Sequence, residues 1–207
     1  GAMYLVAGML AGLLRAKTSG VGTVVDAAIY DGSAHMMNLL MSIRQAGGFG
    51  ETRGQNLLDG PHWSRSYACA DGGYMTVQCL EPKFYAQFLS LMGLAEDAEF
   101  KHQFDTSTWP VLTARLAGIF AAQPRAHWAA LFDGTDACVA PVLSPDEALQ
   151  HPMNARGTWV EQDGVLQAAP APRFDHSPAW QPTAPPARGH DSSTILAELG
   201  LIKEDPR

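Results

Sequence analysis

The N-terminal stretch constrains the fold most strongly, because it is apolar and yet too short to cross a membrane. Gly1 to Leu14 carries no charged side chain, and Arg15 and Lys17 end the run. A membrane span needs about 20 apolar residues, and a signal peptide would place basic residues before its apolar segment. Its small residues would let another element approach closely: Gly8, Ala11 and Gly12. We therefore predict a buried helix over residues 2–16 that other protein covers.

The next forty-odd residues also favour helix. Thr23 to Val25 is β-branched and predicts a short strand. Residues 27–46 predict a second long helix, buried on most sides because its apolar residues are spread widely around it. These residues are Met36, Met37, Leu39, Leu40, Met41 and Ile43. Gly47 and Gly48 end this helix, and residues 48–62 form a polar, glycine-rich loop.

A small α+β unit follows. Residues 66–70 and 74–79 are strand-like and are joined by Asp71–Gly72–Gly73, which predicts an antiparallel hairpin. Pro82 is suited to the first turn of a helix, because it lacks only an N–H that has no helical partner there. Further helices are predicted over 109–121 and 124–132, and a short extended stretch over 138–143.

The C-terminal part reads as a tail. Ser144 with Glu147 predicts a capping box, and residues 158–168 predict a weak hairpin around Asp163–Gly164. Six prolines between Pro170 and Pro186 exclude a helix there and favour an extended tether. A last short helix is predicted over 192–199.

Composition excludes several classes of function. The net charge is -7, which disfavours sequence-independent nucleic-acid binding, because that binding requires cations against phosphates. The cysteines are few and widely spaced (Cys69, Cys79 and Cys138), so they predict no metal site and favour reduced, mostly buried thiols in a cytoplasmic protein.

Four segments, in order and with matching spacing, carry a resemblance to a known family. Residues 20–28 are GVGTVVDAA, residues 53–60 are RGQNLLDG, residues 79–85 are CLEPKFY, and residues 131–143 are LFDGTDACVAPVL. Together they resemble the α-methylacyl-CoA racemases of the CoA-transferase family III, and the resemblance covers nearly the whole chain.

The resemblance implies an α/β fold in which a large Rossmann-like domain is interrupted by a small domain, with two chains interlocked as a homodimer. Residues 1–62 would end the large domain and connect it onward. Residues 63–150 would form the small α+β domain, and residues 151–207 an extended tail and helix returning to the large domain. The N-terminal CoA-binding part would precede residue 1.

The resemblance also implies a reaction, the inversion of the carbon next to an acyl-CoA thioester. One group removes the α-proton, another returns a proton to the opposite face, and donors stabilise the enolate-like intermediate. The family's principal His/Asp pair would precede residue 1, so residues 1–207 alone are expected to be inactive. No metal or redox cofactor is implied, CoA is part of the substrate, and no nucleic acid or membrane partner is expected.

Glu81 is the catalytic-site candidate within the chain. The resemblance assigns it to the glutamate that supports the catalytic His of the other subunit. A carboxylate beside an imidazole orients the ring and stabilises its protonated form. Without the resemblance, a helix N-terminal carboxylate just before Pro82 is the simpler interpretation.

Other polar residues carry weaker indications. Arg53, Gln55 and Asn56 are candidate substrate-binding residues, and a role in fixing their loop fits them equally well. Asp26 and Asp31 are interpreted as helix N-terminal carboxylates, and His35 as a hydrogen-bonded core or interface residue.

Two alternative functions stay open. The first is a family III CoA transferase, which acts through an aspartyl-CoA thioester. The second is a truncated, inactive dimerisation partner. The chain also departs from its relatives at Ser64, where they often have Tyr, and at Thr23, commonly Gln, so the acyl group stays open.

Overall fold

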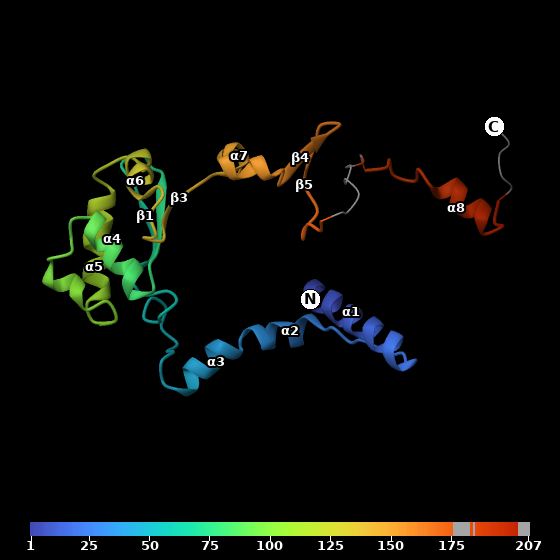
Figure 1. The fold of residues 1–207 in the computed structure, drawn as a ribbon, viewed down its shortest axis with the longest axis horizontal. Coiled ribbons are helices and arrows are strands. Elements are labelled where there is room, and N and C mark those ends of the chain that lie inside the picture. Colours follow the sequence, from blue (N-terminus) through green and yellow to red (C-terminus); the bar gives the residue numbers. More distant parts are fainter. Residues whose placement is uncertain (176–182, 184, 203–207) are drawn as a thin grey trace. The chain divides into compact units, whose positions relative to one another are not determined.

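The structure is a computed structural model that describes residues 1–175, 183 and 185–202. The chain divides into two compact units, Gly1–Val142 and Leu143–Arg207, which are described separately (Figure 1). Helices and small sheets are mixed, which confirms the predicted α/β class. The three-part division expected from the resemblance stays a prediction.

Helix α1 (Ala2–Ser19) confirms the predicted N-terminal helix, and Gly20 ends it with a φ of 73°. The small residues act as predicted. A Cβ at Gly8 would lie 2.6 Å from Val25 Cγ1, so glycine lets the extended 23–25 segment lie against the helix. That segment pairs with no strand among the described residues, so the predicted strand is wrong. The expected burial is also wrong in this chain, since none of the residues of α1 is buried.

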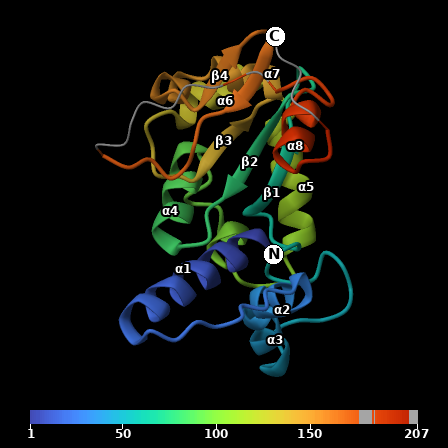
Figure 2. The ribbon, with the colours of Figure 1, turned by 90° about the vertical axis from the view of Figure 1, so that its right-hand side faces the viewer.

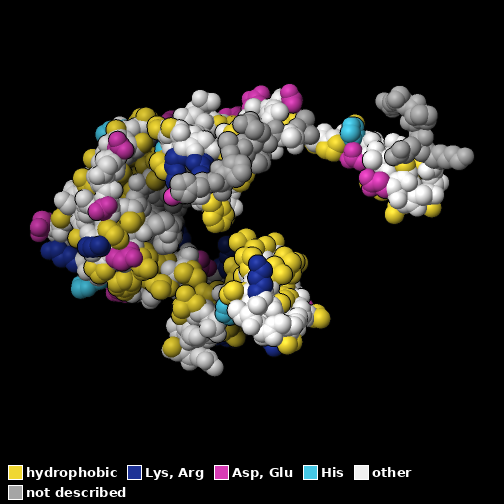
Figure 3. Space-filling view, turned by 45° about the vertical axis from the view of Figure 1, so that its right-hand side comes forward, with side chains coloured by type: hydrophobic (Ala, Val, Ile, Leu, Met, Phe, Trp, Pro, Cys, Tyr) yellow, Lys and Arg dark blue, Asp and Glu magenta, His cyan; other side chains and the backbone are white. Residues whose placement is uncertain are grey.

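The predicted long helix over 27–46 is divided in two. Helix α2 (Ile29–Met36) and helix α3 (Asn38–Gln45) meet at Met37. Most of their apolar side chains are exposed, such as Met36 at 75% and Leu39 at 68%, so the expected burial on most sides is wrong here. Among the described residues, α2 contacts α1 through Tyr4 against Gly32, and the buried core cluster contains no residue of α2 or α3. Figure 3 shows apolar side chains gathered on the surface of the N-terminal helical segment.

A three-stranded antiparallel sheet follows, in the order β1–β2–β3. Its strands are β1 (Ser64–Ala68), β2 (Tyr74–Gln78) and β3 (Val139–Val142). The hairpin is confirmed, with Tyr67 opposite Met75. Strand β1 ends earlier than predicted because Cys69 and Ala70 turn out of the ladder. Cys69 N–H bonds to Gly73 O, and Ala70 N–H bonds to Gln123 O in another segment.

Helices cover one side of this sheet (Figure 2). They are α4 (Pro82–Leu91), the 3₁₀ helix η1 (Ala98–Lys101), α5 (Trp109–Phe120) and α6 (Arg125–Phe132). Leu112, Leu116 and Phe120 recur every four residues, so they line one face of α5 and are fully buried.

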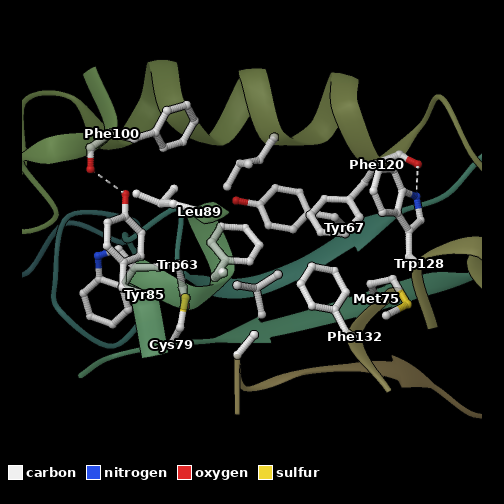
Figure 4. Packing of buried hydrophobic residues seen from close by; sticks show 14 of the residues in the cluster. Trp63, Tyr67, Met75, Cys79, Tyr85, Leu89, Phe100, Phe120, Trp128 and Phe132 are labelled. Carbon is white, nitrogen blue, oxygen red and sulfur yellow. Dashed lines mark hydrogen bonds between the residues drawn. The ribbon is translucent and has the colours of Figure 1, made fainter. Parts of the chain in front are cut away.

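Aromatic rings join the strands to the helices in this core (Figure 4). Tyr67 from β1 stacks on Phe120 with ring centroids 5.1 Å apart, and Phe120 meets Trp128 of α6 edge-on at 5.1 Å. The indole N–H of Trp128 donates to Phe120 O at 2.9 Å. These contacts pack α5 and α6 against the sheet.

The second unit contains the short elements of the tail. They are α7 (Pro145–Gln150), η2 (Pro152–Arg156), β4 (Trp159–Gln162), β5 (Val165–Ala168) and α8 (Ser192–Glu198). The Ser144–Glu147 capping box and the hairpin around Asp163–Gly164 are confirmed. The prolines between 170 and 186 lie partly outside the described residues, and no helix is found in the described part of that stretch.

Candidate functional site

Glu81 is the N-cap residue of α4. Its backbone is extended (φ -75°, ψ 138°), and its side chain accepts no hydrogen bond from the first turn of the helix. Its carbonyl oxygen accepts bonds from the N–H groups of Phe84 and Tyr85, both at 3.0 Å. The side chain is exposed. The backbone is therefore anchored by the helix while the carboxylate faces the surface, which an approaching group could reach.

The candidate substrate loop is held by its own hydrogen bonds. Asn56 is buried, with Oδ1 accepting from Gly50 N–H at 2.7 Å and Nδ2 donating to Thr52 O at 3.2 Å. Asp59 accepts from the N–H groups of Gly54 and Asn56, and these bonds hold the pKa of its carboxyl below its usual range. The Asn56 side chain thus fixes the loop.

Arg53 and Gln55 lie exposed on the same loop. The three predicted residues lie on one loop, but Asn56 is buried whereas Arg53 and Gln55 are exposed. Substrate contact by Arg53, Gln55 and Asn56 stays a prediction.

A second group of polar residues lines a cavity of about 300 Å³ between α1 and α2. Asp26, Asp31 and His35 all border it, and the His35 ring nitrogen Nδ1 lies 2.7 Å from Tyr4 Oη. The predicted hydrogen bond of His35 is present, although the ring is exposed. Sequence reasoning missed Tyr4, because a tyrosine within an apolar run gives no sign of a distant partner.

Comparison of the sequence with known proteins identifies the family. A sequence profile described as CoA-transferase family III matches residues 1–192. The chain belongs to this family. It is also 36% identical to an α-methylacyl-CoA racemase of Mus musculus and 34% identical to that of Homo sapiens, in each case over 99% of the chain. It spans about half of those relatives, 55% and 54% of their lengths.

Solved structures support the fold of this family III chain. The protein Rv3272 of M. tuberculosis matches 93% of the chain with a TM-score of 0.69 at 21% identity, over 52% of its own length. A CAIB/BAIF family protein from Brucella suis matches 95% of the chain with a TM-score of 0.67 at 20% identity, over 53% of its length. Within the part of the chain that is described, no helix is long and apolar enough to span a membrane.

Cys138 interacts with Glu81 in this family III chain, whereas sequence reasoning treated it only as one of three mostly buried thiols, and its side chain is exposed. It opposes the end of β2, where Gln78 N–H bonds to Cys138 O at 3.0 Å, and its φ is 54°. Partial burial raises the pKa of its thiol, and the carboxylate of Glu81 raises this pKa further, while Lys83 lowers it. The surface around Glu81 therefore contains a thiol and an ammonium group as well as the carboxylate. No cluster of metal-ligand side chains occurs among the described residues.

His62 was also missed, because a single histidine in a loop gives no sequence signal of burial. Its side chain is fully buried, with Nε2 2.7 Å from Tyr85 Oη, while Tyr85 Oη donates to Phe100 O at 3.0 Å. Since that hydroxyl uses its only proton on Phe100, His62 must donate from Nε2. Burial, together with a smaller effect of the Arg65 charge, lowers the pKa of His62 to about 4. His62 is a neutral core residue.

Proposed function

We propose that the protein containing this chain is a racemase or epimerase of 2-methylacyl-CoA thioesters. The observation that carries the proposal is the 36% identity to the mouse α-methylacyl-CoA racemase, which extends over 99% of the chain. The substrate is an acyl-CoA, so CoA enters with the substrate, and no metal or redox group is required for the proton transfers.

The reaction requires a base on one face of the α-carbon and an acid on the other. By the family resemblance, the principal His/Asp pair lies before residue 1. General acid–base groups contribute about 10²- to 10⁴-fold each. Residues 1–207 alone are therefore expected to give no α-proton exchange above a blank without enzyme.

Glu81 supports this chemistry from the junction of β2 and α4. In the proposed homodimer its carboxylate approaches the catalytic His of the partner subunit and stabilises the imidazolium form. Two features of the site support this role: the side chain is exposed, and it is not used as a helix cap. A capping carboxylate would instead bond to the N–H groups of the first turn.

The test uses the full-length protein, with the N-terminal part that its relatives carry placed before residue 1. Incorporation of solvent deuterium at the α-carbon of a 2-methylacyl-CoA measures kcat. Glu81→Gln should lower kcat by about tenfold or more, which corresponds to about 1.4 kcal/mol in the transition state. The apparent pKa of the catalytic His should also fall, because the charge that favours its protonated form is gone.

The matched control is Glu96→Gln. Glu96 is a highly exposed glutamate near the other end of α4, and its carboxylate lies 3.7 Å from the Lys101 ammonium group. Its substitution should therefore leave kcat unchanged. The unfolding midpoint of both variants is measured alongside. Unchanged kcat across the pH range for Glu81→Gln would remove Glu81 from the site. Slight destabilisation with normal turnover would assign it to the helix end instead.

CoA transfer between carboxylic acids is the second candidate, and the family III profile over residues 1–192 favours it. This reaction moves CoA from a thioester to a free acid through an enzyme-bound aspartyl thioester. The same protein is therefore supplied with a thioester and an unrelated free carboxylate. Formation of a new thioester without deuterium at the α-carbon would replace the racemase by the transferase.

A further inference from the structure

We propose that Gln103 is a positioning residue for Glu81, because its amide holds the two peptide carbonyls that immediately precede Glu81. The inference rests on the proposed function, in which the Glu81 carboxylate meets the catalytic His. Gln103 itself lies between η1 and α5, far from Glu81 in sequence, and its side chain is buried.

The contact is a pair of hydrogen bonds from one nitrogen. Gln103 Nε2 donates to Cys79 O at 3.0 Å and to Leu80 O at 2.9 Å. Both acceptors are carbonyl oxygens, so only the NH₂ end of the amide satisfies them, and this fixes the orientation of the side chain. The chain turns at this point from β2, which ends at Gln78, into α4. Pro82 has no N–H with which to anchor the turn.

Gln103 is itself held rigidly. Its main-chain carbonyl oxygen accepts hydrogen bonds from two buried indoles, Trp63 Nε1 at 3.0 Å and Trp109 Nε1 at 2.9 Å. Trp63 O in turn accepts the Cys79 N–H at 3.1 Å. The bonds therefore form a closed circuit through Trp63, Cys79 and Gln103. These bonds attach the turn before Glu81 to the buried Trp63 and Gln103, so the turn is held against the core.

The consequence is that the backbone of Glu81 is fixed on both sides. The Gln103 amide holds the two carbonyls before it, and the N–H groups of Phe84 and Tyr85 hold its own carbonyl. The carboxylate makes no capping bond to the helix, so the backbone at Glu81 sets the point and direction from which this side chain reaches outward. Small displacements of a group that meets a reacting centre cost large factors in rate.

A double-mutant cycle in the full-length protein tests this inference. Gln103→Leu removes both donors, and we expect kcat for α-proton exchange to fall about tenfold with less than about a threefold change in KM. In the Glu81→Gln background the same change should cost less than about twofold, because the group that Gln103 positions is already lost. The pH profile of Gln103→Leu should shift in the same direction as that of Glu81→Gln. An equal loss of kcat in both backgrounds would overturn the proposal.

A purely structural role is separated by stability measurements. Gln103→Leu leaves two carbonyls without a donor, so its unfolding midpoint should fall in both backgrounds, unlike its effect on kcat. Trp128→Phe is the matched control, because it removes one buried bond to Phe120 O at the opposite end of the core from Cys79 and Tyr85 (Figure 4). It should lower stability and leave kcat within about twofold. A comparable loss of kcat in this control would assign the effect of Gln103→Leu to lost stability and overturn the proposal.

Gln103→Asn keeps the amide but is shorter, and it serves if the leucine variant does not fold. Its kcat should fall at least about threefold with Glu81 present and hardly at all in the Glu81→Gln background, and equal losses would again overturn the proposal. The proposed function fails separately, if the wild-type protein exchanges no α-proton; the positioning role then falls with it. With an active wild type and an active Glu81→Gln variant of unchanged kcat, only the roles of Glu81 and Gln103 are rejected.

Discussion

The first unit contains an N-terminal helical part, residues 1–60, and a core part, residues 61–142. The two parts have similar apolar content, but large apolar side chains are mostly exposed in the first and buried in the second. Between residues 61 and 142, large side chains such as Phe88, Leu112 and Leu116 are fully buried. In α1, Leu10 is 63% exposed and Leu14 is 66% exposed. Large contiguous apolar surfaces are typical of contact sites. The comparison teaches that an apolar sequence indicates a surface suited to burial, whereas burial itself requires another segment or chain to pack against that surface.

The largest expected difference between the two parts comes from the same substitution made in each. Leu116→Ala should lower the free energy of unfolding by about 3–5 kcal/mol, because it opens a cavity in a closed core. Leu10→Ala should change it by less than about 0.5 kcal/mol. Urea unfolding of the 207-residue chain, followed by the fluorescence of the buried Trp63, Trp109 and Trp128, measures both. A cost for Leu10→Ala that grows with protein concentration would show that α1 is covered by self-association.

A second difference concerns pH, because the core part contains a buried neutral histidine. The pKa of His62 is lowered from 6.5 to about 4 in the folded chain. As pH falls from 6.5 toward 4, the unfolded chain takes up a proton at this ring and the folded chain does not. Stability is therefore fully present above 6.5 and is lost on acidification, by about 2–3 kcal/mol.

His62→Gln should flatten this dependence between pH 6.5 and 4, because a glutamine amide does not titrate. The pKa values of Asp59, Asp71 and Asp97 are lowered from 3.8, so these carboxyls add to the loss of stability from about pH 5 downward, and the slope between pH 6.5 and 5 is the part assigned to His62. Unfolding free energies at half-unit pH steps give the slope. An undiminished slope in His62→Gln would assign the dependence to other groups.

The sequence predicted elements wherever the local chemistry is self-contained. The Asp71–Gly72–Gly73 turn, the Ser144–Glu147 capping box and Pro82 in the first turn of α4 each act within a few residues, and all are found. Burial of α1 and the 23–25 strand were predicted wrongly, because both depend on distant partners.

The same limit applies to the candidate site. Glu81 was proposed through a family resemblance and not through any local pattern, and its role stays a prediction. Gln103 and His62 carry no signal in sequence, since the bonds that single them out reach segments 23 to 40 residues away, such as Trp63 to Gln103 and His62 to Tyr85. Periodicity describes neighbours along a helix or strand, whereas these bonds join loops whose approach is set by the core.

A smaller effect is expected at the boundary of the core part, at Gly60. A Cβ there would lie 2.7 Å from Gly54 O and 2.9 Å from Trp109 Cε3. Neither neighbour yields easily, since one is backbone and the other is part of a buried indole. Gly60→Ala should therefore lower the free energy of unfolding by about 1–3 kcal/mol, measured by urea unfolding. An unchanged midpoint would show that the loop holding Asn56 can move away from α5.

The smallest expected effect compares two helix-interior glycines. In α5, nothing lies within 4 Å of a Cβ at Gly118, so Gly118→Ala should raise the free energy of unfolding by about 0.5–1 kcal/mol through reduced backbone freedom in the unfolded chain. In α1, a Cβ at Gly12 would lie 3.3 Å from Thr23 Cγ2 and 3.4 Å from Val25 Cγ2. Gly12→Ala gains the same helix preference but pushes the extended segment outward, so the two terms should nearly cancel. Helix content by circular dichroism and urea midpoints measure both variants. A clear gain from Gly12→Ala would show that the 23–25 segment moves readily, which would make α1 the looser part of the chain in its internal packing as well as in its cover.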